Sequence, residues 1–286
     1  VGFSVQVAQR IGAKQDEEAR SVLRQGLFVG FLVSILIALI GLMVSPYLPN
    51  WLGGPQELYE DARVYFLIFC LGTPAALLGF MASSMLRSTG NVKLPSIINI
   101  GMCFLDAFFN LLLIFPTSDY NILGFKLTVP GANLGVAGAA LGTILAELVS
   151  AGLMLWFLLV KSEKLSLIGR KGSFIPEIFC MRRTFRIGSP IALERIAMSG
   201  AQIVTTMIVA PLGPIALAAH SFAITAESLC YMPGFGVADA ASTIVGQSIG
   251  AKRPAIARRF AKINVLMVMV MMSAMGVLMY ITAPWM

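Results

Sequence analysis

Long apolar stretches separated by short polar linkers run through the whole chain. Seven of them are long enough for an α-helix to cross a hydrocarbon core of ~30 Å, which takes about 20 residues. They cover residues 21–48, 62–86, 94–115, 133–160, 185–210, 214–246 and 263–285. Residues 1–9 resemble the end of an earlier stretch. The pattern predicts an all-α integral membrane protein, a bundle of transmembrane helices.

The composition agrees with a membrane protein and argues against several other classes. Of the 286 residues, 57% are hydrophobic and 12% are charged, about half the usual charged share of a soluble domain. The apolar content excludes a disordered chain, and the four cysteines are too scattered for a disulfide scaffold. An enzyme is disfavoured because the chain has a single histidine, no phosphate-binding loop and no metal-ligand cluster. We therefore expect no cofactor other than a coupling ion.

Basic residues are concentrated in alternate linkers. All Lys and Arg residues except Arg63, Lys126 and Arg195 lie near residues 10–24 or after the second, fourth and sixth stretches. The positive-inside rule places such linkers in the cytoplasm, so we predict a multi-pass protein of the cell (cytoplasmic) membrane. This bias and contact with anionic headgroups of the lipid bilayer account for the net charge of +7. Nothing in the sequence indicates nucleic-acid binding.

A short motif occurs twice. Residues 7–14 (VAQRIGAK) return as residues 245–252 (VGQSIGAK) at an offset of 238 residues. One period holds six complete stretches, an even number, so both copies enter the membrane in the same direction, as in parallel transporter repeats. We predict a twelve-helix protein of two six-helix lobes, with this chain running from the end of span 2 to span 9. Residues 1–160 then form the remainder of the N-terminal lobe, 161–184 a basic cytoplasmic linker between the lobes, and 185–286 the start of the C-terminal lobe.

Several motifs together resemble the multidrug and toxic compound extrusion (MATE) family. They are the repeated Gln-x-x-Gly-Ala motif, the run 135–140 with Thr143, the linker 87–95, and residues 232–236 (MPGFG). The resemblance implies two lobes around a central cavity that alternates in access. It also implies efflux of drugs or organic cations, cationic or amphipathic, in exchange for Na⁺ or H⁺. We expect such a transporter to be a monomer.

Four carboxylates lie deep in the predicted spans: Asp106, Glu147, Glu194 and Glu227. A charge at the bilayer centre costs at least ~2.5–3.5 kcal/mol on insertion scales, so these groups should face a protein interior or a wet cavity. There, binding of H⁺ or Na⁺ can be coupled to conformation. The alternative is a structural ion pair in which Arg195 neutralises Glu227 or Glu147. We treat Glu194 and Glu227 as ion-coupling candidates, and as substrate-cavity candidates Glu147, Arg195 and Met232.

Asp106 and Asn110 are four residues apart and share one helix face, where both side chains can reach one ion. The resemblance adds Thr143, which matches a threonine on the sixth span of the family, and so implies a Na⁺ site at Asp106, Asn110 and Thr143. The order of Asp and Asn is the reverse of the usual family order, which leaves Na⁺ and H⁺ as alternatives.

Proline and glycine inside the spans mark places where helices can bend, because proline removes a backbone hydrogen bond. The hinge candidates are Pro190, Pro233, Gly234 and Gly236. Two other functions stay open. A flippase for lipid-linked oligosaccharides from the same superfamily would usually line its cavity with several arginines, whereas Arg195 is the one deep arginine here. A passive channel fits the duplicated lobes less well than alternating access does.

Overall fold

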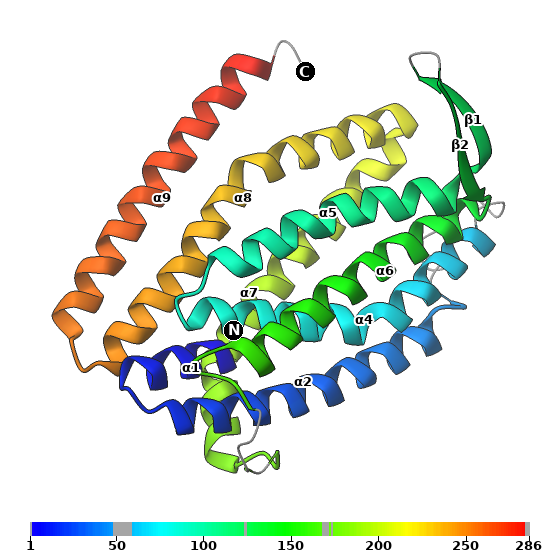
Figure 1. Ribbon diagram of the computed structural model, residues 1–286. Coiled ribbons are helices and arrows are strands. Elements are labelled where there is room, and N and C mark those ends of the chain that lie inside the picture. Colours follow the sequence, from blue (N-terminus) through cyan, green and yellow to red (C-terminus); the bar gives the residue numbers. More distant parts are fainter. Residues whose placement is uncertain (1, 48–58, 123–124, 168–171, 173, 284–286) are drawn as a thin grey trace. The chain divides into compact units, whose positions relative to one another are not determined.

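The computed structural model describes residues 2–47, 59–122, 125–167, 172 and 174–283, and most of them are helical (Figure 1). The chain divides into two compact units. One consists of Val1–Ala19 with Glu177–Met286, and the other of Arg20–Pro176. The first helix of the chain is therefore grouped with the C-terminal helices.

The unit Arg20–Pro176 contains most of α2 (Asp16–Val44) and three further long helices. These are α4 (Tyr59–Ser88), α5 (Lys93–Ile114) and α6 (Gly135–Trp156), and α6 continues in a π-helical turn, Phe157–Lys161. Three acidic residues in the first turn of α2 favour its start there, because the N-terminal end of a helix attracts negative charge.

Helix α6 packs against both α4 and α5. A β-carbon on Gly79 of α4 would lie 2.9 Å from the β-carbon of Ala151, and one on Gly72 would lie 2.6 Å from Ile144. The contacts are seven residues apart on both helices, so α4 and α6 run parallel. Gly138 of α6 lies against the carbonyl of Leu113 on α5, and these two helices run antiparallel. Glycine at these points permits the close approach of helix backbones that is typical of membrane bundles.

The other unit contains α1 (Gly2–Gly12), α7 (Ile178–Val209), a 3₁₀ turn at Ala210–Leu212, α8 (Pro214–Gly250) and α9 (Pro254–Thr282). Both α8 and α9 begin with proline, whose fixed φ and missing N–H suit the first turn of a helix. Helix α8 packs along α9, and α1 contacts both α7 and α8.

Most of the predicted membrane-spanning stretches are confirmed as long apolar helices. Six helical segments of the described chain are long and apolar enough to cross a membrane: 16–44, 59–88, 93–114, 135–161, 215–250 and 254–282. The predicted stretch 185–210 is helical within α7 but is not among the six, since α7 also carries several Arg residues and Glu194. The last predicted stretch begins nine residues too late, because the basic first turns of α9 interrupt its apolar pattern. The all-α membrane fold class is confirmed.

A β-hairpin was not expected. Strands β1 (Pro116–Ile122) and β2 (Phe125–Ala132) pair antiparallel between α5 and α6, where the sequence analysis placed only a linker. At its base, Thr117 Oγ1 accepts from the Gly131 N–H at 3.1 Å. Residues 125–129 alternate apolar and polar positions, which is the period of a strand. The much longer apolar stretches on both sides conceal this signal.

Candidate ion-coupling site

Helix α5 places Asp106 and Asn110 side by side, as their spacing predicts. The Asn110 Nδ2 group donates a hydrogen bond to Asp106 Oδ1 at 3.2 Å. This bond fixes the orientation of the amide, because its N–H side faces the carboxylate and its oxygen points elsewhere. Two polar side chains in the middle of an apolar helix are thus held in one defined arrangement.

The amide oxygen of Asn110 is the most informative atom of this pair. It is buried, and it has no hydrogen-bond partner among the described residues. A β-carbon on Gly142 of α6 would overlap it, so the oxygen is directed at the close contact between α5 and α6. Leaving a buried acceptor unpaired costs ~1–3 kcal/mol, which a bound cation or proton donor would recover. Amide and carboxylate oxygens are the donors that hard cations prefer, so the residues present fit Na⁺.

Helix α6 brings a second carboxylate toward the pair. Thr143 follows Gly142 directly and is half-buried, and Glu147 lies one turn further along α6. Gly142 faces Asn110 in the antiparallel register, so Glu147 lies close to the level of Asp106. The two carboxylates interact electrostatically. Glu147, which the sequence analysis assigned to a substrate cavity, therefore lies beside the predicted ion site.

The candidates on α7 and α8 belong to the other unit. Glu194 and Glu227 are exposed, and so is Met232. Arg195 lies over the ring of Phe235 on α8, with its guanidinium carbon 4.3 Å from the ring centroid. Among the described residues no ion pair joins Arg195 to Glu227, and the structural pairing of these two residues stays an untested alternative.

The hinge candidates lie inside continuous helices. Pro190 is within α7 and Pro233 within α8, and α8 is bent along its length (Figure 1). A β-carbon on Gly234 would lie 3.3 Å from the sulfur of Met272 on α9, whereas Gly236 has open space around it. Gly234 therefore also allows α8 to pack closely on α9.

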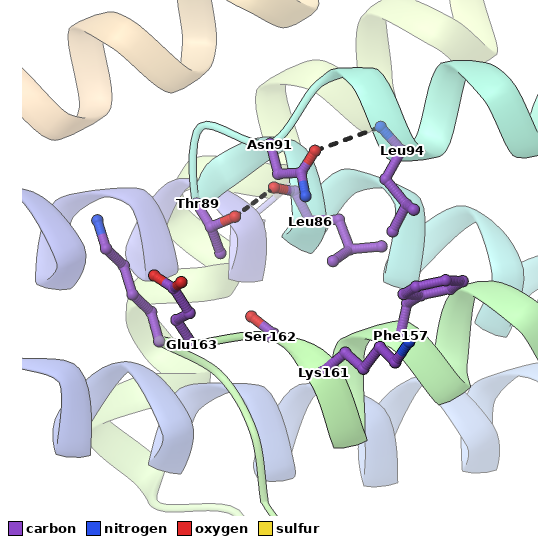
Figure 2. Close-up of a pocket in the computed structure, with 9 residues that line it drawn as sticks. Leu86, Thr89, Asn91, Leu94, Phe157, Lys161, Ser162 and Glu163 are labelled. Carbon is purple, nitrogen blue, oxygen red and sulfur yellow. Dashed lines mark hydrogen bonds between the residues drawn. The ribbon is translucent and has the colours of Figure 1, made fainter.

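A separate pocket of about 330 Å³ lies between the α4–α5 loop and the end of α6 (Figure 2). Two of its polar side chains form hydrogen bonds with backbone groups at the ends of helices. The Thr89 hydroxyl donates to the Leu86 carbonyl at 2.7 Å, and Asn91 Oδ1 accepts from the Leu94 N–H at 3.3 Å. The ammonium group of Lys161 lies 5.0 Å from the Trp156 ring centroid. None of the predicted site residues lines this pocket.

Comparison with known proteins gives a consistent family match. The MatE family model matches residues 1–112 and 190–286. A probable multidrug resistance protein NorM from Thermotoga maritima is 30% identical over 87% of this chain, and one from Photorhabdus laumondii is 26% identical over 97%. These alignments cover 51% and 58% of the two relatives, so the chain spans little more than half of their length.

Solved structures show the same fold. The chain superimposes on a MOP superfamily transporter from Pyrococcus furiosus with a TM-score of 0.85 and 22% identity. It superimposes on an outward-facing multidrug resistance MATE family transporter with a TM-score of 0.83 and 21% identity. Both alignments cover 99% of this chain and 60% of the other.

Proposed function

Because the chain belongs to the MatE family, we propose that it forms part of a twelve-helix multidrug efflux transporter. This transporter exports cationic or amphipathic compounds across the cytoplasmic membrane in exchange for Na⁺ or H⁺. The similarity to proteins named for multidrug resistance supports this proposal, as do the six helices able to cross a membrane. Members of this family are transporters rather than enzymes. We expect the intact transporter to work as a monomer, with its basic linkers in the cytoplasm.

The observation that carries the proposal is the Asp106–Asn110 pair with its unpaired amide oxygen. An antiporter needs a site whose occupancy by a cation changes the packing of its helices, because only a difference in binding between two conformations moves an equilibrium. The pair lies at the contact between α5 and α6, where a change in either side chain is transmitted to a helix backbone.

The carboxylate of Glu147 gives a physical reason why ion binding changes the packing of the helices. When Asp106 and Glu147 are both ionised, they repel each other inside a low-dielectric bundle. A Na⁺ ion on Asp106 and Asn110, or a proton on either acid, removes that repulsion. Occupancy therefore favours close packing of α5 on α6, and release of the ion favours their separation. Glu194 and Glu227 are further coupling candidates on the C-terminal helices.

The test uses the complete transporter in proteoliposomes and a fluorescent organic cation. Uptake is followed under a Na⁺ gradient at equal pH, and separately under a pH gradient without Na⁺. Asp106→Asn should abolish the response to the driving gradient. Asn110→Ala should raise the ion concentration for half-maximal transport roughly tenfold, which corresponds to about 1.4 kcal/mol. Glu60→Gln is the matched control, because it removes an exposed carboxylate at the start of α4.

The outcomes separate the competing functions. If Asp106→Asn responds to the gradients as Glu60→Gln does, the ion site is placed wrongly. Cation movement that needs neither gradient would indicate a channel. A protein that moves no organic cation but translocates a lipid-linked oligosaccharide would be a flippase.

A further inference from the structure

The pocket at the end of α6 is formed by two segments that are far apart in the sequence (Figure 2). The α4–α5 loop contributes Thr89 and Asn91, and the opposite wall comes from the segment between Phe157 and Lys164. Both segments belong to the unit Arg20–Pro176. Both also lie in the basic linkers that the positive-inside rule assigns to the cytoplasmic side. With a volume of about 330 Å³, the pocket is in the size range of small-molecule sites.

The side chains around this pocket are typical of a membrane interface. The ammonium group of Lys161 lies over the rings of Trp156 and Phe157, and Trp156 is 46% exposed. Trp and Lys side chains combine an apolar body with a polar tip, so they gather where hydrocarbon meets the lipid headgroups. Val160 directly precedes Lys161, Ile97 lies one turn along α5 from the pocket, and both are exposed. Apolar surface therefore continues from the pocket toward the hydrocarbon core.

Hydrogen bonds within the chain leave two side-chain donors of the pocket unused. Asn91 Oδ1 accepts from the Leu94 N–H, and Ser162 Oγ accepts from the Leu165 N–H at 3.3 Å. Among the described residues, neither the Asn91 Nδ2 group nor the Ser162 hydroxyl proton has an acceptor. The amide nitrogen of Asn91 points toward the end of α6 (Figure 2). Together with the ammonium group of Lys161, these donors suit the oxygens of a phosphate group.

The charged side chains of the pocket have both signs. Of the lining residues, Lys161 and Lys164 carry positive charge and Glu163 carries negative charge. Glu163 forms no ion pair with any described residue, and Figure 2 shows it on the side of Thr89, away from Lys161. A phosphate group alone would leave this carboxylate without a counter-charge, whereas a ligand that also carries an ammonium group would supply one. The lining therefore fits a headgroup that contains a phosphate and a primary ammonium group.

We propose that this pocket binds the headgroup of a phosphatidylethanolamine molecule from the cytoplasmic leaflet. The phosphate accepts hydrogen bonds from Asn91, Ser162 and Lys161. The ammonium group donates to the carboxylate of Glu163, and the acyl chains follow the exposed apolar surface of α5 and α6. That surface favours a lipid over a soluble phosphate ester, because only a lipid covers it. The bound lipid joins the α4–α5 loop to the end of α6, away from the ion-coupling residues.

Native mass spectrometry of the complete transporter, delipidated in detergent, tests the site. Phosphatidylethanolamine, phosphatidylcholine and phosphatidylglycerol with identical acyl chains are titrated separately, and the Kd of the first bound lipid is measured. Phosphatidylethanolamine should bind roughly tenfold more tightly than the other two, because neither carries an N–H that can donate to Glu163. It should also slow hydrogen exchange at residues 86–96 and 157–165, and soluble phosphoethanolamine should leave that exchange unchanged. None of these measurements needs cargo or an ion gradient, so a failure here is distinguishable from a failure of the proposed transport function.

Two variants separate the two ends of the headgroup. Glu163→Gln should raise the Kd for phosphatidylethanolamine roughly tenfold and leave that for phosphatidylcholine unchanged, whereas the control Glu60→Gln should keep the preference. Asn91→Asp keeps the oxygen that accepts from the Leu94 N–H but replaces the donor with a negative charge, so it should weaken binding of both lipids. The proposal is overturned if the wild type binds phosphatidylcholine or phosphatidylglycerol as tightly as phosphatidylethanolamine, or if Glu163→Gln keeps the preference. Slower exchange with soluble phosphoethanolamine would also overturn it, because the pocket would then take a soluble phosphate ester. The wild-type comparison decides the question even if Asn91→Asp does not fold.

Discussion

Gly142 of α6 lies against the side chain of Asn110 in the candidate ion site, and Gly142→Ala tests how that site is built. The new methyl group would occupy the space of the Asn110 amide oxygen. Asn110 cannot simply rotate away, because its Nδ2 group is bonded to Asp106. Either this hydrogen bond breaks, or α5 and α6 move apart. Both responses act on the same two residues that are proposed to hold the ion.

The expected loss of stability follows from the size of the overlap. Adding one methyl group to a close-packed contact typically costs about 1–3 kcal/mol. Breaking the Asn110–Asp106 bond would cost about 1.5–3 kcal/mol, because one partner is a charged group. The two costs are alternatives rather than a sum, since the side-chain movement that relieves the overlap also breaks the bond. We therefore expect Gly142→Ala to lower the free energy of unfolding by about 1–3 kcal/mol.

Thermal unfolding of the complete transporter in detergent provides the assay, with Gly152→Ala as control. Gly152 lies on the same helix, and a β-carbon there would have open space around it, so alanine should leave the transition unchanged or raise it slightly. Gly142→Ala should unfold several degrees below the wild type and the control. The double variant Gly142→Ala/Asn110→Ala should recover at least half of the loss, because the overlapping oxygen is gone. Equal transitions for the two single variants would refute the contact between α6 and the site.

Two further predictions concern α7. Burial raises the pKa of the Cys180 thiol, and the nearby Glu177 carboxylate raises it further, so less of the reactive thiolate is present at neutral pH than for a free cysteine. Maleimide labelling of Cys180, followed by mass spectrometry, should therefore be slow at pH 7 and become faster as the pH rises. Gln6→Ala should speed it by opening the contact that covers the thiol. Arg195→Ala should lower the free energy of unfolding by about 0.5–1 kcal/mol by removing the cation–π contact with Phe235. Arg195→Lys should retain part of that stability, and an equal loss in both variants would contradict the contact.

The membrane helices could be predicted from the sequence because their lengths follow from the thickness of the bilayer. Apolar runs fix the middle of each helix, but they do not fix its ends. Helix α9 begins at Pro254, in a basic segment that hydropathy alone assigns to a linker. The hairpin between α5 and α6 was missed for a related reason, since its strand period covers only a few residues beside two long apolar runs.

Only the part of the candidate ion site that lies on a single helix could be predicted from the sequence. The spacing of Asp106 and Asn110 places them together, because four residues are about one helical turn. The position of Glu147 depends on the register of α6 against α5. That register is set by Gly138 and Gly142. By sequence alone, neither glycine differs from Gly152, where an added β-carbon would meet no neighbouring helix. The separation of the chain into its two units depends likewise on contacts between distant residues, such as those of α1 with α8.

The repeated motif shows how far one sequence pattern can be interpreted. One helix ends within residues 7–14, at Gly12, and another ends within residues 245–252, at Gly250. The close contacts between the two copies, of Gly12 with Gln247 and of Gly250 with Gln9, were not predicted, although symmetry makes them reasonable. A helix end that lies on a two-fold axis meets its symmetry-related copy there. Each contact between the two copies that lies off the axis then occurs twice. A glycine that permits close approach in one copy is therefore needed in the other copy as well. Gly12 and Gly250 meet this condition, so the internal repeat contains information about packing that hydropathy does not.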